Sequence, residues 1–498
     1  MIKTYFRRHP IRTKRALEIL PGFVSWSLIL FPFWGSLIFP TAVAYYVITF
    51  AVYWLYRSLS VAILSILAHL KISAAKQFDW IGYLKNHFPR KWKTIHHIIV
   101  IPTYKEPVQT LRRTLEALSK QSFPTKNLHI MISFENREGK PAREKAKKLK
   151  KEFKNKFSNL WVTFHPDIDG EVKGKSSNTS WGAKKAKLFL VDDKNIPIEN
   201  ITITSQDADA VLHHHYFSNL TYKFLNTDQR YNKIWQGNIV FYNNIWQVPA
   251  PVRVMASIFS VTQMYILMRK DRLINFSTYS TSLKHVHEIG YWDTDVIPED
   301  YRLFFKSYFA KKGNFEVEPI FLPIYQDAAE SSSTLETYKN QYEQLKRWAW
   351  GTSDDAYIIR QYVLTEGMPF LDKTIRVLKV IEDHFLWPVN WFAITVSAIL
   401  PPLLNEQFNR TMIGKTLPQV TSFLLTLSLV SMVVIFIIDA LNRPPRPNKR
   451  NLFSYIIQPM EFLMLPIVGF FFSALPGIDA HTRLMMGKYI EYKVTEKV

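Results

Sequence analysis

The feature that most constrains the fold is an uncharged stretch of 38 residues, Ile19 to Tyr56, near the start of the chain. A single helix of this length would be about 57 Å long, nearly twice the ~30 Å thickness of a hydrocarbon core. We therefore predict two membrane spans that join near Pro40, the second continuing through Arg57, whose long side chain can snorkel to the membrane surface. A cleaved signal peptide is the competing interpretation, but the stretch is too long and has no clear small-residue cleavage site.

Basic residues concentrate before this stretch, and they predict its orientation. The first fifteen residues contain six of them: Lys3, Arg7, Arg8, Arg12, Lys14 and Arg15. Because positively charged flanks stay in the cytoplasm, we expect the N-terminus there. Two spans then return the chain to the cytoplasm.

The apolar pattern returns near the end of the chain. Phe385–Asn405 and Thr416–Ile438 are uncharged, and each is long enough to span a membrane. Asn442–Asn451 contains four basic residues and is predicted to be a cytoplasmic loop. Leu452–Ile478 is interrupted by Pro459, Glu461 and Pro466, so it is either a kinked span or a re-entrant segment, and the side of the C-terminus stays open.

Between the two apolar regions, strand and helix patterns alternate. The predicted strands are His96–Tyr104, Asn127–Glu135, Leu160–Pro166 and Ile201–Gln206, and the predicted helices are Val108–Gln121, Pro141–Phe157 and a segment near 177–190. Such alternation predicts an α/β domain with a mostly parallel sheet and helices on both faces. We divide the chain into residues 1–71 with two spans, a soluble-looking domain at 72–365, and a membrane region at 366–498.

Composition narrows the classes of function. The chain has no Cys, which excludes disulfides and thiol catalysis. Its formal net charge of +22 suits an anionic membrane, anionic substrates or nucleic acid. No nucleic-acid recognition module is recognisable, so we predict no nucleic-acid partner.

Two carboxylates, Asp207 and Asp209, directly follow the strand pattern of Ile201–Gln206. Ligands of α/β sheets bind beyond the carboxyl ends of strands, and Mg²⁺ or Mn²⁺ prefers carboxylate oxygens. The pair therefore predicts a site for a metal and a diphosphate, although a solvated turn is the plain alternative. The run His213–His215 is a poor three-His site because neighbouring side chains point apart, but one of them could join Asp209.

Other polar residues follow the remaining strands. Thr103, Tyr104 and Glu106 end the first strand, and Glu135 ends the second; alone, each is also typical of an ordinary turn. Lys175 lies in a glycine-containing segment that lacks the four-residue spacing of a phosphate-binding P-loop, so we exclude an NTPase and keep Lys175 as a candidate phosphate contact or a solvated lysine.

Two later motifs complete the candidate set. Asp300 begins an apolar-periodic helix, where an acidic residue is either a cap or a base that removes a proton from a hydroxyl. Gln344, Arg347 and Trp348 share one helix face by their spacing. Arg suits a diphosphate and Trp suits the face of a sugar ring, while a membrane-interface helix with a Trp anchor would need the same residues.

These motifs follow one another in an order that resembles a membrane-embedded family 2 glycosyltransferase, similar to the cellulose and hyaluronan synthases. The resemblance covers roughly residues 95–360 and the flanking spans, and Gln-x-x-Arg-Trp is its most specific element. It implies a GT-A fold and an inverting transfer from a nucleotide-diphosphate sugar, with a UDP-sugar expected, and with Mg²⁺ or Mn²⁺ as cofactor.

The resemblance also implies a role for each candidate. Asp300 would be the catalytic base; the other implied groups are donor binding by Thr103, Tyr104, Glu106, Glu135, Lys175 and Asp207, metal binding by Asp207 and Asp209, and acceptor or diphosphate binding by Gln344, Arg347 and Trp348. Three positions depart from the usual pattern: Lys105 replaces Asn, Glu135 replaces Asp, and Pro298 replaces Thr. The first two departures leave the donor base open.

The expected function is that of a processive polysaccharide synthase, a hexosyl- or N-acetylhexosaminyltransferase that extends a glycan at the membrane. Single-sugar transfer to a polyprenyl phosphate or glycolipid is one alternative, and a non-catalytic scaffold that binds nucleotide sugars is another. The expected partners are therefore the nucleotide sugar, a glycan or lipid-linked acceptor, and membrane lipids. We expect an integral protein of the cell membrane with its catalytic domain in the cytoplasm.

Overall fold

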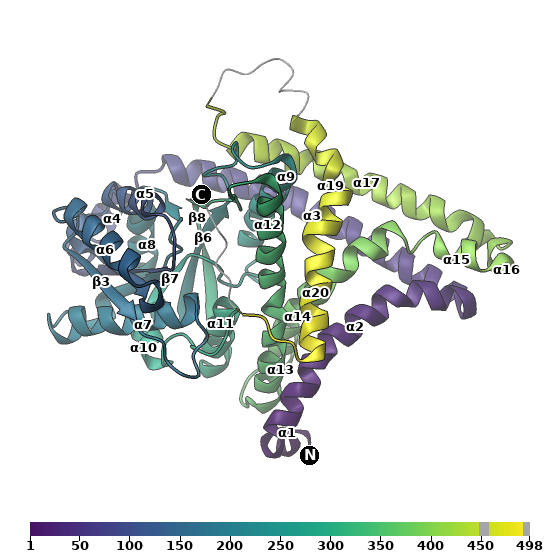
Figure 1. The fold of residues 1–498 in the computed structure, drawn as a ribbon, viewed down its shortest axis with the longest axis horizontal. Helices are drawn as coiled ribbons and strands as arrows, with labels where there is room; N and C mark the ends of the chain where they lie inside the picture. Colours follow the sequence, from purple (N-terminus) through teal and green to yellow (C-terminus); the bar gives the residue numbers. More distant parts are fainter. Residues whose placement is uncertain (448–457, 492–498) are drawn as a thin grey trace.

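A computed structural model describes residues 1–447 and 458–491. A charged α/β domain lies on one side, and long helices extend away from it on the other (Figure 1). The strands are β1 His96–Thr103, β2 Leu128–Glu135, β3 Asn159–His165, β4 Ile201–Ser205, β5 Val211–Leu212, β6 Lys233–Val240, β7 Tyr279–Ser282 and β8 Glu316–Tyr325. The domain helices are α4 Trp80–His87, α5 Val108–Ser119, α6 Lys140–Glu152, α7 Lys175–Lys187, α8 Tyr216–Leu225, α9 Ala250–Leu267, α10 Leu283–Glu288, α11 Glu299–Ala310, α12 Thr334–Ala349 and α13 Asp355–Leu364.

The remaining helices belong to the two ends of the chain. They are α1 Ile2–Arg8, α2 Pro10–Ile38, α3 Pro40–Gln77, α14 Phe370–Thr395, α15 Leu400–Leu404, α16 Glu406–Asn409, α17 Met412–Asn442, α19 Leu465–Gly469 and α20 Leu475–Met486. The domain is therefore inserted between N-terminal and C-terminal apolar helices, as predicted.

The described strands form one sheet in the order β3-β2-β1-β4-β7-β6-β8-β5. The pairings among β3, β2, β1 and β4 are parallel, and β6 pairs with β8 in parallel. This confirms the predicted α/β fold of the GT-A type. Among the described strands, β7 and the short β5 run antiparallel to their neighbours. The sequence patterns did not predict the half of the sheet formed by β7, β6, β8 and β5.

Alternating side chains bury both faces of the sheet. In β1, Ile99 and Ile101 pack into the core that α5 and α8 cover, while Ile98 and Val100 pack into the core on the other face, beneath α7. Successive residues of a strand point to opposite faces, so a strand buried on both sides needs an unbroken apolar run. This is why the central strands were recognisable from sequence.

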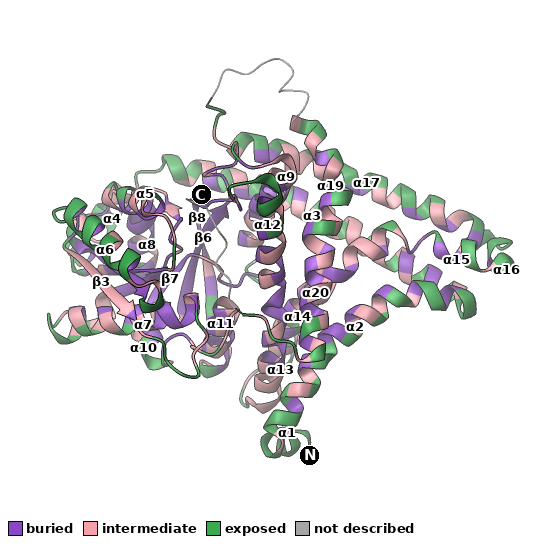
Figure 2. Cartoon of the chain, in the orientation of Figure 1, coloured by how far each residue is buried: buried purple, intermediate pink, exposed green. Residues whose placement is uncertain are grey.

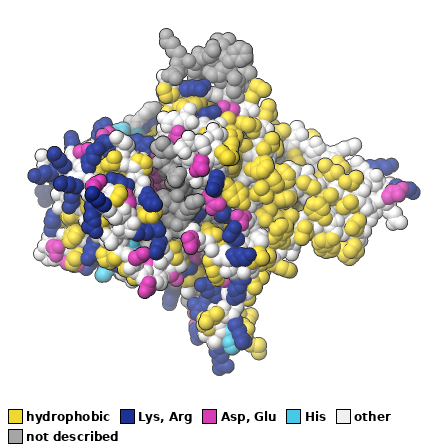
Figure 3. Space-filling view, in the orientation of Figure 1, with side chains coloured by type: hydrophobic (Ala, Val, Ile, Leu, Met, Phe, Trp, Pro, Cys, Tyr) yellow, Lys and Arg dark blue, Asp and Glu magenta, His cyan; other side chains and the backbone are white. Residues whose placement is uncertain are grey.

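Five helical stretches are long and apolar enough to cross a membrane, judged by length and composition over the described residues: α2, α3, α9, α17 and Gln458–Met486. α2 ends and α3 begins on either side of Phe39, which is where the two spans were predicted to join. Figures 2 and 3 show exposed apolar side chains covering the helices that project from the domain, with charged side chains again at their far tip. An exposed apolar band of this kind is typical of helices that lie in a membrane.

Two segments differ from the predicted spans. The stretch Phe385–Asn405 is not one helix, because α14 ends at Thr395 and the short α15 follows, with Pro401 and Pro402 in its first turn. α9 is as apolar as a span, yet 56% of its most apolar window is buried inside the protein, where it packs against β6, α3 and α17. Apolar length alone could not separate these cases, because a buried core helix and a span have the same composition.

The basic segments at both ends contact the domain side of the apolar band. Lys3 forms an ion pair of 2.9 Å with Glu366, and the indole of Trp246 donates a 2.9 Å hydrogen bond to the carbonyl oxygen of Pro444. The predicted loop beyond residue 447, and the first residues of the segment that begins at Leu452, lie outside the described residues.

Candidate active site

A single cavity of about 360 Å³ lies beyond the carboxyl ends of β1, β2 and β4. All eleven predicted site residues line it: Thr103, Tyr104, Glu106, Glu135, Lys175, Asp207, Asp209, Asp300, Gln344, Arg347 and Trp348. Neighbouring parallel strands end at the same edge of the sheet, which explains how residues more than 100 positions apart meet. α9, α11, α12 and α14 close the opposite side of the cavity.

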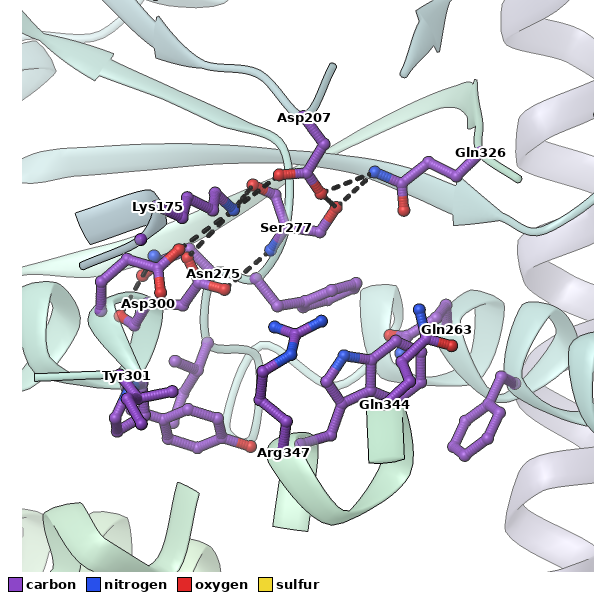
Figure 4. A pocket seen from close by; sticks show the side chains of 18 of the residues that line it. Lys175, Asp207, Gln263, Asn275, Ser277, Asp300, Tyr301, Gln326, Gln344 and Arg347 are labelled. Atoms are coloured by element: carbon purple, nitrogen blue, oxygen red, sulfur yellow. Dashed lines mark hydrogen bonds and ion pairs between the residues drawn. The ribbon is translucent and has the colours of Figure 1, made fainter. Parts of the chain in front are cut away.

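Lys175, at the start of α7, is the central cation of the cavity (Figure 4). Its Nζ lies 2.8 Å from Asp207, 3.0 Å from Glu299 and 4.0 Å from Asp300, and it donates a 2.6 Å hydrogen bond to the carbonyl oxygen of Ser277. Burial lowers the pKa of Lys175, but the three carboxylates outweigh burial and raise it well above its ordinary value. Lys175 is therefore charged and is not a solvated lysine.

The Asp207 carboxylate is held by neutral donors as well. It accepts hydrogen bonds of 2.7 Å from the Ser277 hydroxyl and 2.9 Å from the Gln326 side-chain amide. Its backbone amide donates to the Thr278 hydroxyl at 3.1 Å. These partners fix the carboxylate at the edge of the cavity, so Asp207 is not simply part of a solvated turn.

Asp209 is buried, with 4% of its surface exposed. One carboxylate oxygen accepts a 2.9 Å hydrogen bond from the backbone amide of Asp327, whose own carboxylate receives Arg113 at 2.7 Å. Asp209 thus follows its strand as predicted but is not exposed to solvent, and its replacement by Ala would remove the acceptor of the Asp327 amide.

The donor set at Asp207 and Asp209 fits a hard divalent cation. No cluster of three or more His, Asp or Glu ligands exists among residues 1–447 and 458–491. Two carboxylates on a cavity wall nevertheless suit Mg²⁺ or Mn²⁺, because these ions complete their shells with water and substrate phosphates. His213–His215 do not belong to this set: none lines the cavity, and His215 instead contacts the Ser122 hydroxyl at 2.9 Å.

Asp300 lies in the first turn of α11, but its carboxylate contacts a different segment. Oδ2 accepts a 2.8 Å hydrogen bond from the backbone amide of Ser277, whereas Oδ1 is buried with no hydrogen-bond donor among the described residues. Burial and then the neighbouring Glu299 raise the pKa of Asp300 well above its ordinary value, against the opposing charge of Lys175. A carboxylate of this kind is a stronger base than a solvated one.

Sequence reasoning missed Ser277, Asn275 and Gln326. Ser277 has a left-handed φ of 59°, and it contacts Asp207 with its hydroxyl and Asp300 with its amide. Asn275 donates a 3.2 Å hydrogen bond to the backbone oxygen of Asp300. Their stretch, Asn-Phe-Ser, carries no motif, so no signal in the sequence pointed to it.

The turn after β1 is organised by Glu106. Its carboxylate accepts hydrogen bonds of 2.6 Å from the Thr103 hydroxyl and 2.5 Å from the Tyr104 amide. The turn places Lys105 at a left-handed φ of 65°, a conformation that Asn adopts more readily than Lys. The hydrogen bonds to Glu106 stabilise this turn, which therefore accommodates Lys105 where Asn is usual.

Tyr104 and Glu135 are linked by a residue that the motifs did not indicate, Arg137. Its guanidinium lies 3.8 Å from the centre of the Tyr104 ring and 2.5 Å from the Glu135 carboxylate. Glu135 lines the main cavity and, with Arg137, a small neighbouring cavity. The three side chains form a flat, charged surface at this end of the site.

The face of α12 that was predicted from spacing does point into the cavity: Gln344, Arg347 and Trp348 all line it. Figure 4 shows the Arg347 guanidinium directed toward the segment that carries Ser277. The Trp348 ring packs between Phe241 and Phe259, at 5.7 Å and 5.3 Å between ring centres. The cavity wall around Trp348 is therefore aromatic, whereas the wall around Lys175 is charged.

Residues 202–441 match the sequence model of the family described as "Glycosyl transferase family group 2". The match covers a little under half of the chain, from within β4 to the end of α17, and so includes Asp207, Asp300 and the α12 motif. It supports assigning this part of the chain to the family 2 glycosyltransferases. Among curated proteins, no sequence matches the chain.

The solved structures that this chain resembles have low sequence identity to it and low TM-scores. The mannosyltransferase PcManGT from Pyrobaculum calidifontis, in complex with GDP-Man and Mn²⁺, is 12% identical over 75% of this chain and 99% of its own, with a TM-score of 0.41. Residues 1–349 of TarS from S. aureus are 11% identical over 68% of this chain and 90% of that one, with a TM-score of 0.38. At this level of similarity, the substrates of those proteins are not assigned to this chain.

Proposed function

We propose that the protein is an inverting glycosyltransferase that moves a sugar from a nucleotide-diphosphate donor to a growing glycan at the membrane. The observation that carries the proposal is the gathering of all eleven predicted residues around one cavity, within a chain that matches family 2 over residues 202–441. A scaffold that only binds nucleotide sugars would not need a buried, hydrogen-bonded carboxylate aimed into the cavity.

In the proposed reaction, the Asp300 carboxylate removes the proton of the acceptor hydroxyl, while the Ser277 amide holds Oδ2 in place. The hydroxyl oxygen forms a bond to the anomeric carbon as the bond from that carbon to the diphosphate oxygen breaks. The bonding electrons leave with the nucleoside diphosphate, and the configuration at the anomeric carbon is inverted. General-base catalysis of this kind typically supplies about 10²–10⁴-fold.

Cations of the site stabilise the leaving group. Lys175 and Arg347 both line the cavity, and each would contact the diphosphate. Asp207 and Asp209 would hold Mg²⁺ or Mn²⁺, which supplies further charge neutralisation at the phosphates. Tyr104, Glu135 and Arg137 would contact the nucleoside, and a UDP-sugar remains the expected donor.

The acceptor is proposed to be a glycan that stacks on Trp348 and is extended repeatedly. Sugar rings pack well against flat aromatic faces, and Phe241, Phe259 and Trp387 continue the aromatic wall beyond Trp348. Single-sugar transfer to a lipid-linked acceptor would use the same base and differs in the size of the product.

The test uses the full chain reconstituted in lipid nanodiscs with a panel of UDP- and GDP-sugars. We expect release of nucleoside diphosphate with one donor and a metal requirement that EDTA abolishes. The Asp209→Asn variant keeps an acceptor for the Asp327 amide and should need about ten- to a hundred-fold more metal. Product length, measured by mass spectrometry, separates a polymerase from a single-transfer enzyme; no turnover with any donor would support the scaffold.

We propose further that the domain and both basic segments face the cytoplasm. Because the chain has no Cys, single cysteines can be introduced cleanly. Lys151 on the domain and Gln407 at the far tip of the apolar helices are exposed and suit such labels. An impermeant reagent should label the cysteine at 407 in intact cells and the cysteine at 151 only after permeabilisation; the reverse pattern would contradict this orientation.

A further inference from the structure

Residues 268–278, which we name the linker, connect α9 to β7 and reach from α14 to the reaction centre. At its β7 end, the Ser277 amide donates to Asp300 at 2.8 Å and the Ser277 hydroxyl donates to Asp207 at 2.7 Å. Asn275 adds a 3.2 Å hydrogen bond to the backbone of Asp300. The position of the linker therefore sets the position of both carboxylates.

The other end of the linker is fixed by ion pairs to α14. The Arg272 side chain is 9% exposed, and its guanidinium lies 2.6 Å from Glu382 and 3.3 Å from Asp383. The Arg376 guanidinium, on the same helix, donates to the backbone oxygens of Lys270 and Leu273 at 3.1 Å and 3.2 Å. α14 thus holds the linker by both side-chain and backbone contacts.

The same two α14 carboxylates also bind a charged residue of the membrane helix α3. The Arg57 guanidinium donates to Asp383 at 2.9 Å and lies 3.9 Å from Glu382, and the Tyr53 hydroxyl donates to Glu382. At a rise of 1.5 Å per residue, Arg57 lies about 26 Å along α3 from its first residue, Pro40. This distance is close to the ~30 Å thickness of a hydrocarbon core. A charge at that depth is costly unless it is paired, and here pairing replaces the snorkelling expected from sequence.

We propose that Arg57, Asp383 and Arg272 form an ion-pair chain that positions the catalytic carboxylate from the membrane. These ion pairs connect α3 through α14 to the linker, and the linker holds Asp300 through Ser277. Arg57 is a positioning residue, because it does not line the cavity and the linker, not its own side chain, contacts Asp300. The inference rests on the proposed function for its kinetic consequence, whereas the physical coupling of α3 to the linker stands without it.

The kinetic test compares full-length variants in nanodiscs. Arg57→Gln removes the charge and should lower kcat about 10-fold while the donor KM stays within about 2-fold, because an ångström of misplacement at a reacting group already costs much of its effect. Arg57→Lys keeps the charge and should recover most of kcat. Arg112→Gln is the matched control: Arg112 forms an ion pair of 2.8 Å with Glu152 on the domain surface, far from the linker, and its loss should leave kcat unchanged.

A second measurement does not depend on activity. Hydrogen–deuterium exchange of the peptide that covers the linker should be faster in Arg57→Gln than in the wild type and in Arg112→Gln, since the Ser277 amide is protected by its bond to Asp300. Unchanged exchange in the linker, or a parallel fall in kcat, donor affinity and thermal stability, would overturn the proposal and make the ion-pair chain an assembly contact only. If the wild type turns over no donor but Arg57→Gln still exchanges faster, the coupling holds and the proposed function fails.

Discussion

The two walls of the cavity are built by different forces. The charged wall consists of Lys175, Asp207, Asp209, Glu299 and Asp300, in which hydrogen bonds and ion pairs to specific partners hold the carboxylates. The aromatic wall consists of Phe241, Phe259, Trp348 and Trp387, which hold one another by ring packing.

This difference bears on how each wall responds to change. A buried charge that loses its partner costs far more than an aromatic ring that loses one neighbour. Substitutions on the charged wall should therefore act on the chemical step in an all-or-none way. Substitutions on the aromatic wall should act in a graded way on binding of the acceptor.

The largest effect is expected at Asp300. Asp300→Asn keeps the size of the side chain and an acceptor for the Ser277 amide, so the fold should persist. It removes the basic oxygen, and the transfer rate should fall by at least about 10²-fold while donor affinity changes little. Transfer kinetics and calorimetric donor binding, measured on the same preparation, check both statements.

Glu299→Gln is the comparator for this variant. Glu299 lies nearer to Lys175 than Asp300 does, at 3.0 Å against 4.0 Å, yet it receives no contact from Ser277 in the described structure that would aim it as a base. Its loss should reduce transfer less than the loss of Asp300. Equal collapse of donor affinity and rate in Asp300→Asn would show that Asp300 is structural.

A smaller effect is expected on the aromatic wall. Trp348→Ala removes the ring that packs between Phe241 and Phe259 and should raise the acceptor KM about 2- to 12-fold, the range given by 0.5–1.5 kcal/mol of aromatic contact. Trp348→Phe should be closer to wild type, and the donor KM should not change in either variant. A loss of donor affinity in Trp348→Ala would mean that the two walls do not act separately.

The smallest effect is expected at Arg137, which lies on the Tyr104 ring and against Glu135. Arg137→Gln should weaken nucleoside diphosphate binding about 2- to 5-fold, since cation–π contacts at partly exposed sites contribute about 0.5–1 kcal/mol. Titration with UDP and GDP measures whether the loss depends on the base. Tighter binding of either nucleotide in the variant would show that Arg137 blocks the nucleoside position.

The sequence by itself determined the parts of this protein that follow from local pattern. Apolar runs specified β1 and β2, and the alternation of Ile and Thr specified β4. Polar residues at the ends of these strands were recognisable because parallel strands all finish at one edge of a sheet. Spacing of three and four residues placed Gln344, Arg347 and Trp348 on one face of α12. The uncharged N-terminal stretch likewise specified α2 and α3.

Only the tertiary structure decided what those residues contact. Ser277 and Gln326 carry no motif. They reach Asp207 because long-range pairing places β7 beside β4, and β6 and β8 follow β7 in the sheet. The pairing of Arg57 with Asp383 joins positions more than 300 residues apart, which no local period encodes. The physical reason is that hydrogen bonds and ion pairs depend on distances of a few ångströms in space, while sequence patterns fix only the faces of single helices and strands.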